Sequence, residues 1–281
     1  MTNQIHWFPG HMNKALHEVE EKVKLVDVVI ELLDARAPFS SVNEQLEKII
    51  QNKKKLYVLS KPDLADPSQT DKWKKFFQKD GNIVLVLNLT SPNATKDISQ
   101  AINDLGKEKW EKQKAKGMKP QPIRTMIIGI PNTGKSSLIN RIAKRSAAGV
   151  QNKPGYTRGE QWIKVNNDYL LLDTPGILPM NYDDQKKAIN LALLGAIRED
   201  ILPKSDLVNS LLKILKEKYP NSLQNRYGIN EITTKDEMIK AISIRRGVIA
   251  NNGEIDVAKC ENLLLKEFKD GLLGRMTLEW L

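Results

Sequence analysis

The chain has 281 residues, of which 40% are hydrophobic and 28% charged, which indicates a folded globular protein and excludes an intrinsically disordered one. Its apolar stretches, such as residues 28–33, are too short to cross a bilayer, and the single cysteine, Cys260, excludes an internal disulfide. The formal net charge of +10 favours a polyanionic partner, for which RNA is expected, although a lysine-rich solubilising surface would give the same charge.

The N-terminal part of the chain alternates between helix and strand patterns. Residues 12–25 carry Leu16, Val19 and Val23 at helical spacing, and the β-branched run at residues 27–34 predicts a buried strand. Further strands are expected at 55–59, 83–87 and 124–130, a hairpin at 161–165 and 169–173, and helices near 42–51, 70–79, from 94 onward and 135–143. Such alternation predicts a mostly parallel sheet that is covered on both faces.

From about residue 183 the pattern becomes helical. Residues 206–219 carry apolar side chains at helical spacing, and so do residues 256–269, through Val257, Cys260 and Phe268. We therefore expect a smaller all-helical domain at the C-terminal end.

Residues 129–136 (Gly-Ile-Pro-Asn-Thr-Gly-Lys-Ser) match the phosphate-loop pattern G-x-x-x-x-G-K-[ST], between a predicted strand and a predicted helix. Glycines let the backbone wrap around phosphate oxygens, and the N–H groups that open the helix point at the anion. Lys135 is expected to reach the outer phosphates and Ser136 to offer its hydroxyl to Mg²⁺. The nucleotide contacts expected from this loop are those of Asn132, Thr133, Gly134, Lys135, Ser136 and Ser137.

The sequence Asp-Thr-Pro-Gly follows at residues 173–176, directly after an apolar run. Asp173 ends a predicted strand, so we expect it to hold Mg²⁺ through water, while the N–H of Gly176 approaches the γ-phosphate. Thr157, in a glycine-containing loop, is the candidate switch threonine that ligates Mg²⁺ in the triphosphate state. A plain turn and a non-liganding loop threonine are the alternatives.

A candidate base-reading segment, Ser-Lys-Pro-Asp, stands earlier, at residues 60–63, directly after another apolar run. The Asp63 carboxylate would accept hydrogen bonds from the ring N–H and the exocyclic amine of guanine, a donor pair that adenine lacks. Lys61 would lie against the base, and Ser60, which replaces the usual asparagine, is expected to weaken the tie to the phosphate loop. Taken alone, this segment could be a surface turn. Two weaker candidates for a last base-contacting loop are Thr90 and Ser91.

The base-reading segment precedes the phosphate loop, which reverses the order of an ordinary GTPase. Because ligands bind at the carboxyl ends of parallel strands, three strand-end motifs in rotated order predict one site for GTP or GDP with Mg²⁺. The expected fold class is α/β: a circularly permuted P-loop GTPase domain with helices on both faces of its sheet, then the helical domain. We place the domains at 1–180, including the helical segment 1–25, and at 181–281.

Two more motifs, Trp-Phe-Pro-Gly-His-Met at residues 7–12 and Asp-Ala-Arg at 34–36, complete a set that resembles the circularly permuted ribosome-assembly GTPases of the RbgA (YlqF) family. The resemblance covers nearly the whole chain, including Gly-Arg at residues 274–275. It implies late assembly of the large ribosomal subunit and GTP hydrolysis that the subunit or its rRNA stimulates. It also implies that the helical domain contacts RNA.

The resemblance bears on catalysis and on monovalent ions. Ile177 stands where Ras-like enzymes keep the glutamine that orients water, and an isoleucine cannot hydrogen-bond water. His11 is the family-matched candidate for catalysis, with helix capping or core packing as the alternative. Asn132 resembles the asparagine that ligates K⁺ in some potassium-stimulated GTPases, so K⁺ stimulation is a hypothesis and a turn asparagine the alternative. The catalytic candidates are His11, Lys135, Thr157 and Gly176.

We expect a monomer that acts in the cytoplasm on the large ribosomal subunit and its rRNA, with no membrane or DNA partner. The first residues lack the pattern of a secretory signal, and one cysteine fits a reducing compartment. The lysine-rich residues 106–122 are either a solvated helix and linker or a contact for a polyanion.

Two other functions share part of this pattern. A nucleotide-gated RNA-binding module with incidental hydrolysis fits the absence of the water-orienting glutamine. A P-loop ATPase or metabolic kinase fits residues 129–136 but leaves Lys61 and Asp63 unexplained.

Overall fold

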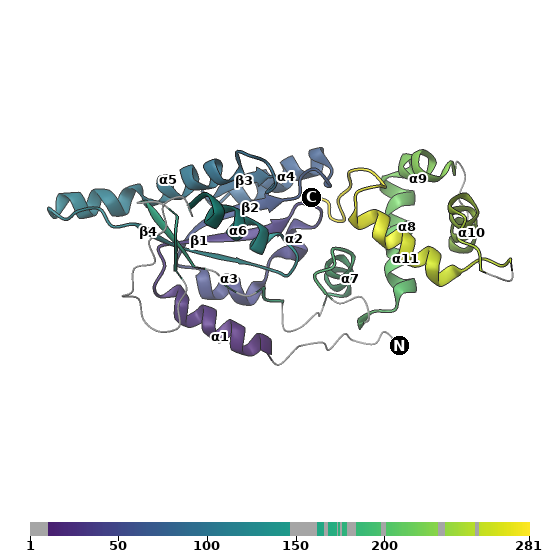
Figure 1. Cartoon of the computed structure of the whole chain (residues 1–281), viewed down its shortest axis with the longest axis horizontal. Helices are drawn as coiled ribbons and strands as arrows, with labels where there is room; N and C mark the ends of the chain where they lie inside the picture. Colours follow the sequence, from purple (N-terminus) through teal and green to yellow (C-terminus); the bar gives the residue numbers. More distant parts are fainter. Residues whose placement is uncertain are drawn as a thin grey trace.

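A computed structural model describes residues 11–146, 162–165, 168–172, 174, 176–178, 184–197, 201–229, 234–250 and 253–281. Within these residues a six-stranded sheet has the order β3-β2-β1-β4-β6-β5 (Figure 1). Its strands are β1 (Val28–Asp34), β2 (Lys54–Ser60), β3 (Ile83–Leu87), β4 (Ile123–Gly129), β5 (Trp162–Lys164) and β6 (Tyr169–Leu172). All neighbouring strands are parallel except β5 and β6, which form the predicted antiparallel pair.

The strand register gathers the motif-bearing strand ends at one edge of the sheet. Asp34 at the end of β1 pairs with Ser60 at the end of β2, and Ser60 pairs with Leu87 at the end of β3. On the other side of β1, Leu32 pairs with Gly129, where the phosphate loop begins. Segments that are far apart in sequence therefore leave the sheet side by side.

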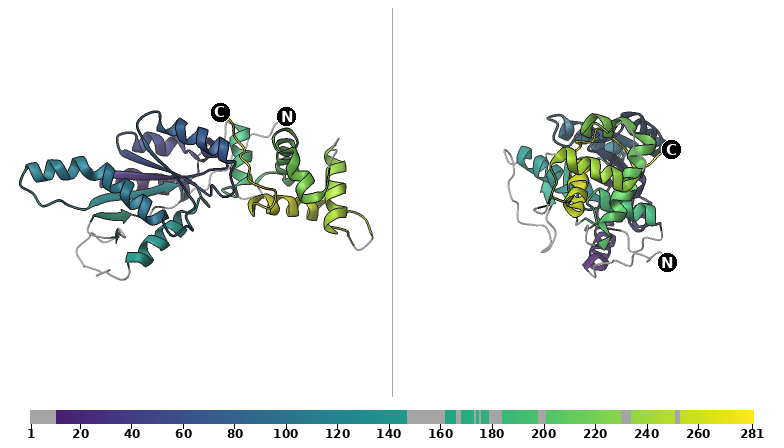
Figure 2. Two further views of the ribbon diagram at one scale, coloured as in Figure 1. Left: turned by 90° about the horizontal axis from the view of Figure 1, so that it is seen from above. Right: turned by 90° about the vertical axis from the view of Figure 1, so that its right-hand side faces the viewer.

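Helices cover both faces of the sheet, as the alternation of patterns predicted. Side chains at alternate positions of β1 point to opposite faces, so Ile30 packs with α5 and α6 while Val29 packs with α1 and α3. Four of the helices on this part of the chain are α1 (His11–Val23), α3 (Glu44–Ile50), α4 (Pro67–Gln78) and α6 (Lys135–Ser146). Two others differ strongly in length: the single turn α2 (Pro38–Ser41) and α5 (Ala94–Ala115), which extends past the sheet in two views (Figures 1 and 2).

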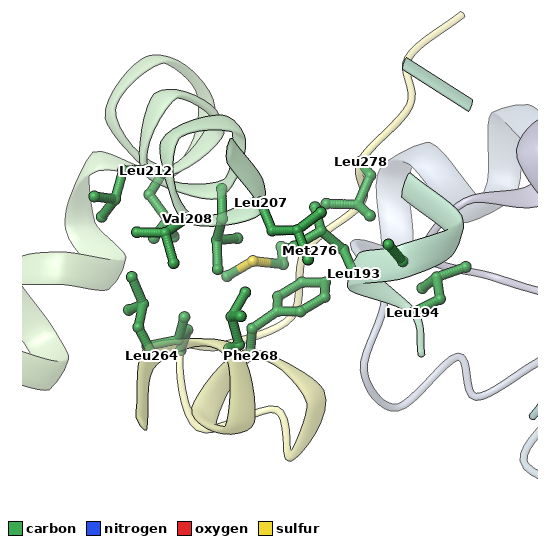
Figure 3. Packing of buried hydrophobic residues seen from close by; sticks show 14 of the residues in the cluster. Leu193, Leu194, Leu207, Val208, Leu212, Leu264, Phe268, Met276 and Leu278 are labelled. Carbon is green, nitrogen blue, oxygen red and sulfur yellow. The ribbon is translucent and has the colours of Figure 1, made fainter. Parts of the chain in front are cut away.

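The C-terminal part of the chain is helical. It contains α7 (Gln185–Leu193), α8 (Lys204–Lys218), α9 (Pro220–Tyr227), α10 (Lys235–Arg246) and α11 (Val257–Lys269). Leu264 and Phe268 of α11 face Leu207 and Val208 of α8, and Met276 of the last segment fills the space beside them (Figure 3). The same cluster contains apolar residues of α7, so α7 packs with this core although it lies next to the sheet in Figure 1.

The predicted fold class is confirmed: a mostly parallel α/β sheet with a phosphate loop, followed by helices. The predicted domain boundary at 180/181 lies outside the described residues, and so do residues 1–10 before α1. In the helical stripe at 256–269, Cys260 and Phe268 are buried but Val257 is exposed, because it is the first residue of α11 after the Asp256 cap. None of the described helices has the length and apolar character that a membrane crossing requires.

Candidate nucleotide site

The phosphate loop connects β4 to α6 and surrounds a cavity of about 490 Å³. Gly129 has a φ of +156°, and a Cβ atom built there would lie 2.7 Å from the carbonyl oxygen of Leu32 on the neighbouring strand. Gly134 has a φ of +96°, and a Cβ atom there would meet the side chain of Leu89. Both glycines are therefore required by the backbone path. The cavity is lined by Lys61, Ile130, Pro131, Asn132, Gly134, Lys135, Ser136, Ser137 and Gly176.

Lys135 and Ser136, which are expected to contact phosphate and Mg²⁺, both line this cavity. Lys135 and Ser136 open helix α6, where the helix dipole and the free N–H groups favour an anion. The Lys135 ammonium group donates a hydrogen bond to the carbonyl oxygen of Thr174, which belongs to the Asp-Thr-Pro-Gly sequence. Ser136 is exposed and offers a hydroxyl oxygen, the type of ligand that Mg²⁺ prefers.

The second motif packs against the phosphate loop from the side of β6. The Thr174 hydroxyl is buried and donates to the carbonyl oxygen of Ile127, and the N–H of Ile177 donates to Gly129 at 3.3 Å. A Cβ atom on Gly176 would lie 3.1 Å from backbone atoms of Pro131, so this glycine permits the close approach of the two loops. The remaining predicted Mg²⁺ ligands, Thr157 and Asp173, lie outside the described residues.

Ser60 joins the base-reading segment to the phosphate loop, so a direct tie is present although Ser60 replaces the usual asparagine. Its side chain is fully buried, and its hydroxyl lies 2.9 Å from the carbonyl oxygen of Thr133 and 3.0 Å from that of Leu33. The hydroxyl has one proton, so it donates to one of these oxygens at a time. A serine at this position therefore reaches the backbone of the phosphate loop.

Lys61 makes a second connection between the two loops. It has a φ of +55°, unusual for a residue with a side chain, and its ammonium group donates to the carbonyl oxygen of Asn132 at 2.7 Å. The same group lies 2.9 Å from a carboxylate oxygen of Asp34. Because Lys61 also lines the cavity, it links the base-reading segment to the wall of the phosphate site.

Asp34 is a residue of this site whose role the sequence reasoning missed. It is completely buried and accepts hydrogen bonds from Arg36 at 2.8 and 2.9 Å as well as from Lys61. Burial alone would raise the pKa of Asp34, but the two cations lower it to about 2, so it stays ionised at neutral pH. A signal was available in the sequence: an aspartate at the end of a predicted strand, two residues before an arginine.

Asp63 and the loop after β3 lie beside the cavity and do not form its wall. Asp63 is exposed, two residues beyond Lys61. The backbone of the loop after β3 is tied to α6, because Arg141 donates to the carbonyl oxygen of Leu89 at 3.0 Å. Thr90 is exposed and hydrogen-bonds to Asn88, while Ser91 is half-buried. The geometry thus brings both candidate base loops against the phosphate loop, at its outer rim.

The remaining residues singled out in the sequence differ in how far their side chains are available to a ligand. The Thr133 side chain is buried and donates to Ile130 at 3.0 Å, so only its backbone is available to a ligand. The amide nitrogen of Asn132 donates to the carbonyl oxygen of Gly195, after α7, which leaves its oxygen as the atom that could ligate K⁺. His11 is the first residue of α1, and its side chain is outside the described part of the chain. Ile177 is fully buried in the core under α1 and α3.

Comparison with protein families gives one match, which covers the phosphate loop and the residues after it. Residues 124–243 match the family described as "50S ribosome-binding GTPase". The match begins in β4 and therefore leaves out residues 60–63, as expected if the base-reading segment has moved in front of the phosphate loop.

Curated relatives match almost the whole chain. A protein of Bacillus cereus named "Ribosome biogenesis GTPase A" is 45% identical over 276 residues, which cover 98% of this chain and 93% of the relative. A protein of the same name from Thermotoga maritima is 29% identical over 97% of this chain and 93% of the relative.

Solved structures agree with these sequence matches. The crystal structure of GNP-bound YlqF from T. maritima superposes with a TM-score of 0.67 and 26% identity, covering 95% of this chain and 98% of that one. A GDP-bound YlqF structure gives the same TM-score at 25% identity, with 94% and 98% covered.

Proposed function

Because the chain belongs to the ribosome biogenesis GTPase A family and is a GTP hydrolase, we propose that it acts in the assembly of the large ribosomal subunit, and that this subunit or its rRNA stimulates hydrolysis. The observation that carries this proposal is the convergence of the base-reading segment and the Asp-Thr-Pro-Gly sequence on the phosphate loop. The matched family description, which names the 50S subunit, supports the choice of subunit.

In the proposed complex the phosphate loop holds the nucleotide and the neighbouring loops read it. Lys135 would contact the outer phosphates, and Ser136, Thr157 and Asp173 would hold Mg²⁺, which would supply charge neutralisation at the phosphates. The N–H of Gly176 approaches the γ-phosphate. Asp63 accepts hydrogen bonds from the guanine edge, with Lys61 against the base and with Thr90 and Ser91 at the rim.

The attacking water needs a group that this chain does not supply at the usual position. Ile177 is buried and apolar, so it cannot orient water for attack on the γ-phosphorus. His11, which opens α1, a helix that packs in the same core as Ile177, is the proposed positioning group, and contact with the subunit would bring it into place. This dependence predicts slow turnover by the isolated protein and stimulation by the partner.

Charge and architecture support RNA as the direct partner. The chain carries ten more basic than acidic side chains, far more than one nucleotide requires. We propose that residues 181–281 form the RNA-contacting helical domain, that the protein works as a cytoplasmic monomer, and that it has neither a DNA nor a membrane partner. K⁺ bound through Asn132 is also part of the proposal, and equal turnover in K⁺ and Na⁺ would remove it.

The test is GTP turnover with and without purified large subunits. We expect large subunits to accelerate release of phosphate more than about tenfold, because a partner that completes a hydrolytic site removes several kcal/mol from the barrier. Small subunits and the Lys135→Ala variant are the controls and should give no acceleration. Nucleotide-dependent RNA binding with the same turnover in the presence and absence of large subunits would instead identify a nucleotide-gated RNA-binding module.

A further inference from the structure

The last residues of the chain run along the loop that carries Asp63. The guanidinium group of Arg275 donates to the carbonyl oxygen of Pro62 at 2.8 Å and to that of Ala65 at 3.0 Å. The N–H of Met276 donates to the carbonyl oxygen of Leu64 at 3.0 Å. Three carbonyl groups on both sides of Asp63 are therefore held by a segment from the far end of the sequence.

The end of the same loop is fixed by the same segment. The N–H of Asp66 donates to the Thr277 hydroxyl at 3.2 Å, and the Tyr219 hydroxyl donates to the Asp66 carboxylate at 3.2 Å. The N–H of Thr277 in turn donates to the Tyr219 hydroxyl at 3.0 Å. Asp66 also caps helix α4, so the network joins the loop, α4 and the helical part of the chain.

An apolar contact also holds this loop against the segment that follows α11. A Cβ atom built on Gly271 would lie 2.6 Å from a methyl group of Leu64, so Leu64 packs directly on the backbone after α11. Inside the loop itself the backbone makes few bonds: Leu64 donates to Lys61 at 3.0 Å and Ala65 to Pro62 at 3.3 Å. These two turns fix the path of the chain only locally. The orientation of the loop towards the phosphate site depends on Lys61 at one end and on the C-terminal segment at the other.

We propose that Arg275 is a positioning residue for guanine recognition, acting through the backbone of residues 62–65. This inference rests on the proposed function, in which Asp63 reads the base. Two hydrogen bonds from one planar guanidinium group to carbonyl oxygens on either side of Asp63 fix its backbone before the ligand arrives. A loop that is already ordered loses less conformational entropy on binding, so affinity and selectivity are higher.

The test compares GDP with inosine diphosphate, which lacks the exocyclic amine that Asp63 would recognise. In Arg275→Ala we expect GDP affinity to fall about tenfold, because the loop is no longer pre-organised by these two hydrogen bonds. The preference for GDP over inosine diphosphate should fall with it, while kcat at saturating GTP changes less than about twofold. Arg275→Lys should recover part of the preference, since one carbonyl contact can be kept.

The matched control is Arg226→Ala. Arg226 also donates two hydrogen bonds from the helical part of the chain, but its acceptor is Glu267 and not the base-reading loop. It should leave the preference for GDP unchanged. If Arg275→Ala lowers the affinities for both nucleotides equally, or leaves them unchanged, the positioning role is refuted. Thr277→Val, which removes the hydroxyl that Asp66 contacts and keeps the side-chain shape, repeats the test should Arg275→Ala fail to fold.

A further variant separates this inference from the proposed function. Asp63→Asn should bind GDP more weakly and gain affinity for xanthosine diphosphate, and in that background Arg275→Ala should no longer change guanine selectivity. Failure of Asp63→Asn to change base preference would refute the proposed guanine contact. If instead Asp63→Asn behaves as expected, and Arg275→Ala leaves the preference for GDP unchanged as Arg226→Ala does, only the role of Arg275 is refuted.

Discussion

A buried carboxyl group, Glu31, lies in the middle of β1 under helix α3. One of its oxygens has no hydrogen-bond partner, and burial raises the pKa of Glu31 well above its usual value, helped by a hydrogen bond to Glu47. Lys55 and Lys187 act in the opposite direction but do not overcome burial. The pair therefore shares one proton, and Glu31 holds it.

This raised pKa gives a signed prediction for Glu31→Gln. As pH rises from about 4.5, the unfolded chain releases a proton that folded Glu31 keeps, so stability falls as pH rises through that window. A glutamine has the same shape, can donate to Glu47 and does not ionise. We expect the variant to gain on the order of 1–3 kcal/mol over the natural chain between pH 5 and pH 8 in urea unfolding. An equal difference between the two proteins at every pH would contradict the protonated state.

Gly176 gives a second prediction at a single position. A methyl group there would lie 3.1 Å from backbone atoms of Pro131 and would shift the N–H proposed to meet the γ-phosphate. For Gly176→Ala we expect unchanged GDP affinity but roughly tenfold weaker binding of a non-hydrolysable GTP analogue, the effect of removing one hydrogen bond to a charged group. Equal decreases for both nucleotides would show that the substitution disturbs the whole phosphate loop.

Individual site residues were predictable where a local pattern carries them. The phosphate loop is defined by its own glycines and lysine, so its cavity lining was predicted almost completely. Arg275 and Gly195 were missed because each acts through a partner far away in sequence, Pro62 for Arg275 and Asn132 for Gly195. No periodicity in a single sequence reports such pairs.

Strands and long helices were predictable because their periodicity is strong. The strands β1 to β4 are nearly continuous apolar runs, and α1 and α8 carry regular apolar stripes. The sequence pattern did not predict α9 and α10 as separate helices. A capping box of Thr234 and Glu237 could have indicated the start of α10. The single turn α2 is too short for any periodic signal, and its N-terminus is stabilised by the distant Glu279 carboxylate.

The exposed end of α5 is expected to contact RNA. Lys107 and Lys112 are paired with acidic neighbours, whereas Lys114, Lys116 and Lys119 lie exposed beyond the last acidic residue of the helix. Replacing the last three by alanine should weaken rRNA binding and lower the slope of log affinity against log salt by roughly 0.7–0.9 for each phosphate that is no longer neutralised. Lys107→Ala/Lys112→Ala is the control, with a smaller effect. An unchanged slope in the triple variant would identify this segment as a solvated helix end.

The helical part of the chain contacts the nucleotide site at several points. Asn132 of the phosphate loop donates to Gly195, the Arg36 guanidinium group lies 5.5 Å from the centre of the Phe268 ring, and the N–H of Leu278 donates to Arg36 at 2.7 Å. After Gly176 the chain continues to α7, which packs with the helical core. Changes at the phosphate loop and the neighbouring residues can therefore reach the helical part of the chain through directly bonded neighbours.

This connection predicts that bound nucleotide sets affinity for the ribosomal partner. If γ-phosphate contacts at Gly176 and Thr157 order the switch residues and so orient the helices, large subunits should bind the protein with a non-hydrolysable GTP analogue at least about fivefold more tightly than with GDP, a typical coupling between two sites. Sedimentation with purified subunits measures the difference. Equal affinity with the GTP analogue and with GDP would contradict the coupling, because hydrolysis would then not change binding to the subunit.

The most direct measurement is a crystal structure with a non-hydrolysable GTP analogue and Mg²⁺. We predict that the Asp63 carboxylate lies about 3 Å from the ring nitrogen and the exocyclic amine of guanine, while Lys135 contacts the β- and γ-phosphates of the same molecule. A nucleotide whose phosphates occupy the loop at 129–136 but whose base lies away from Asp63 would contradict the single converged site.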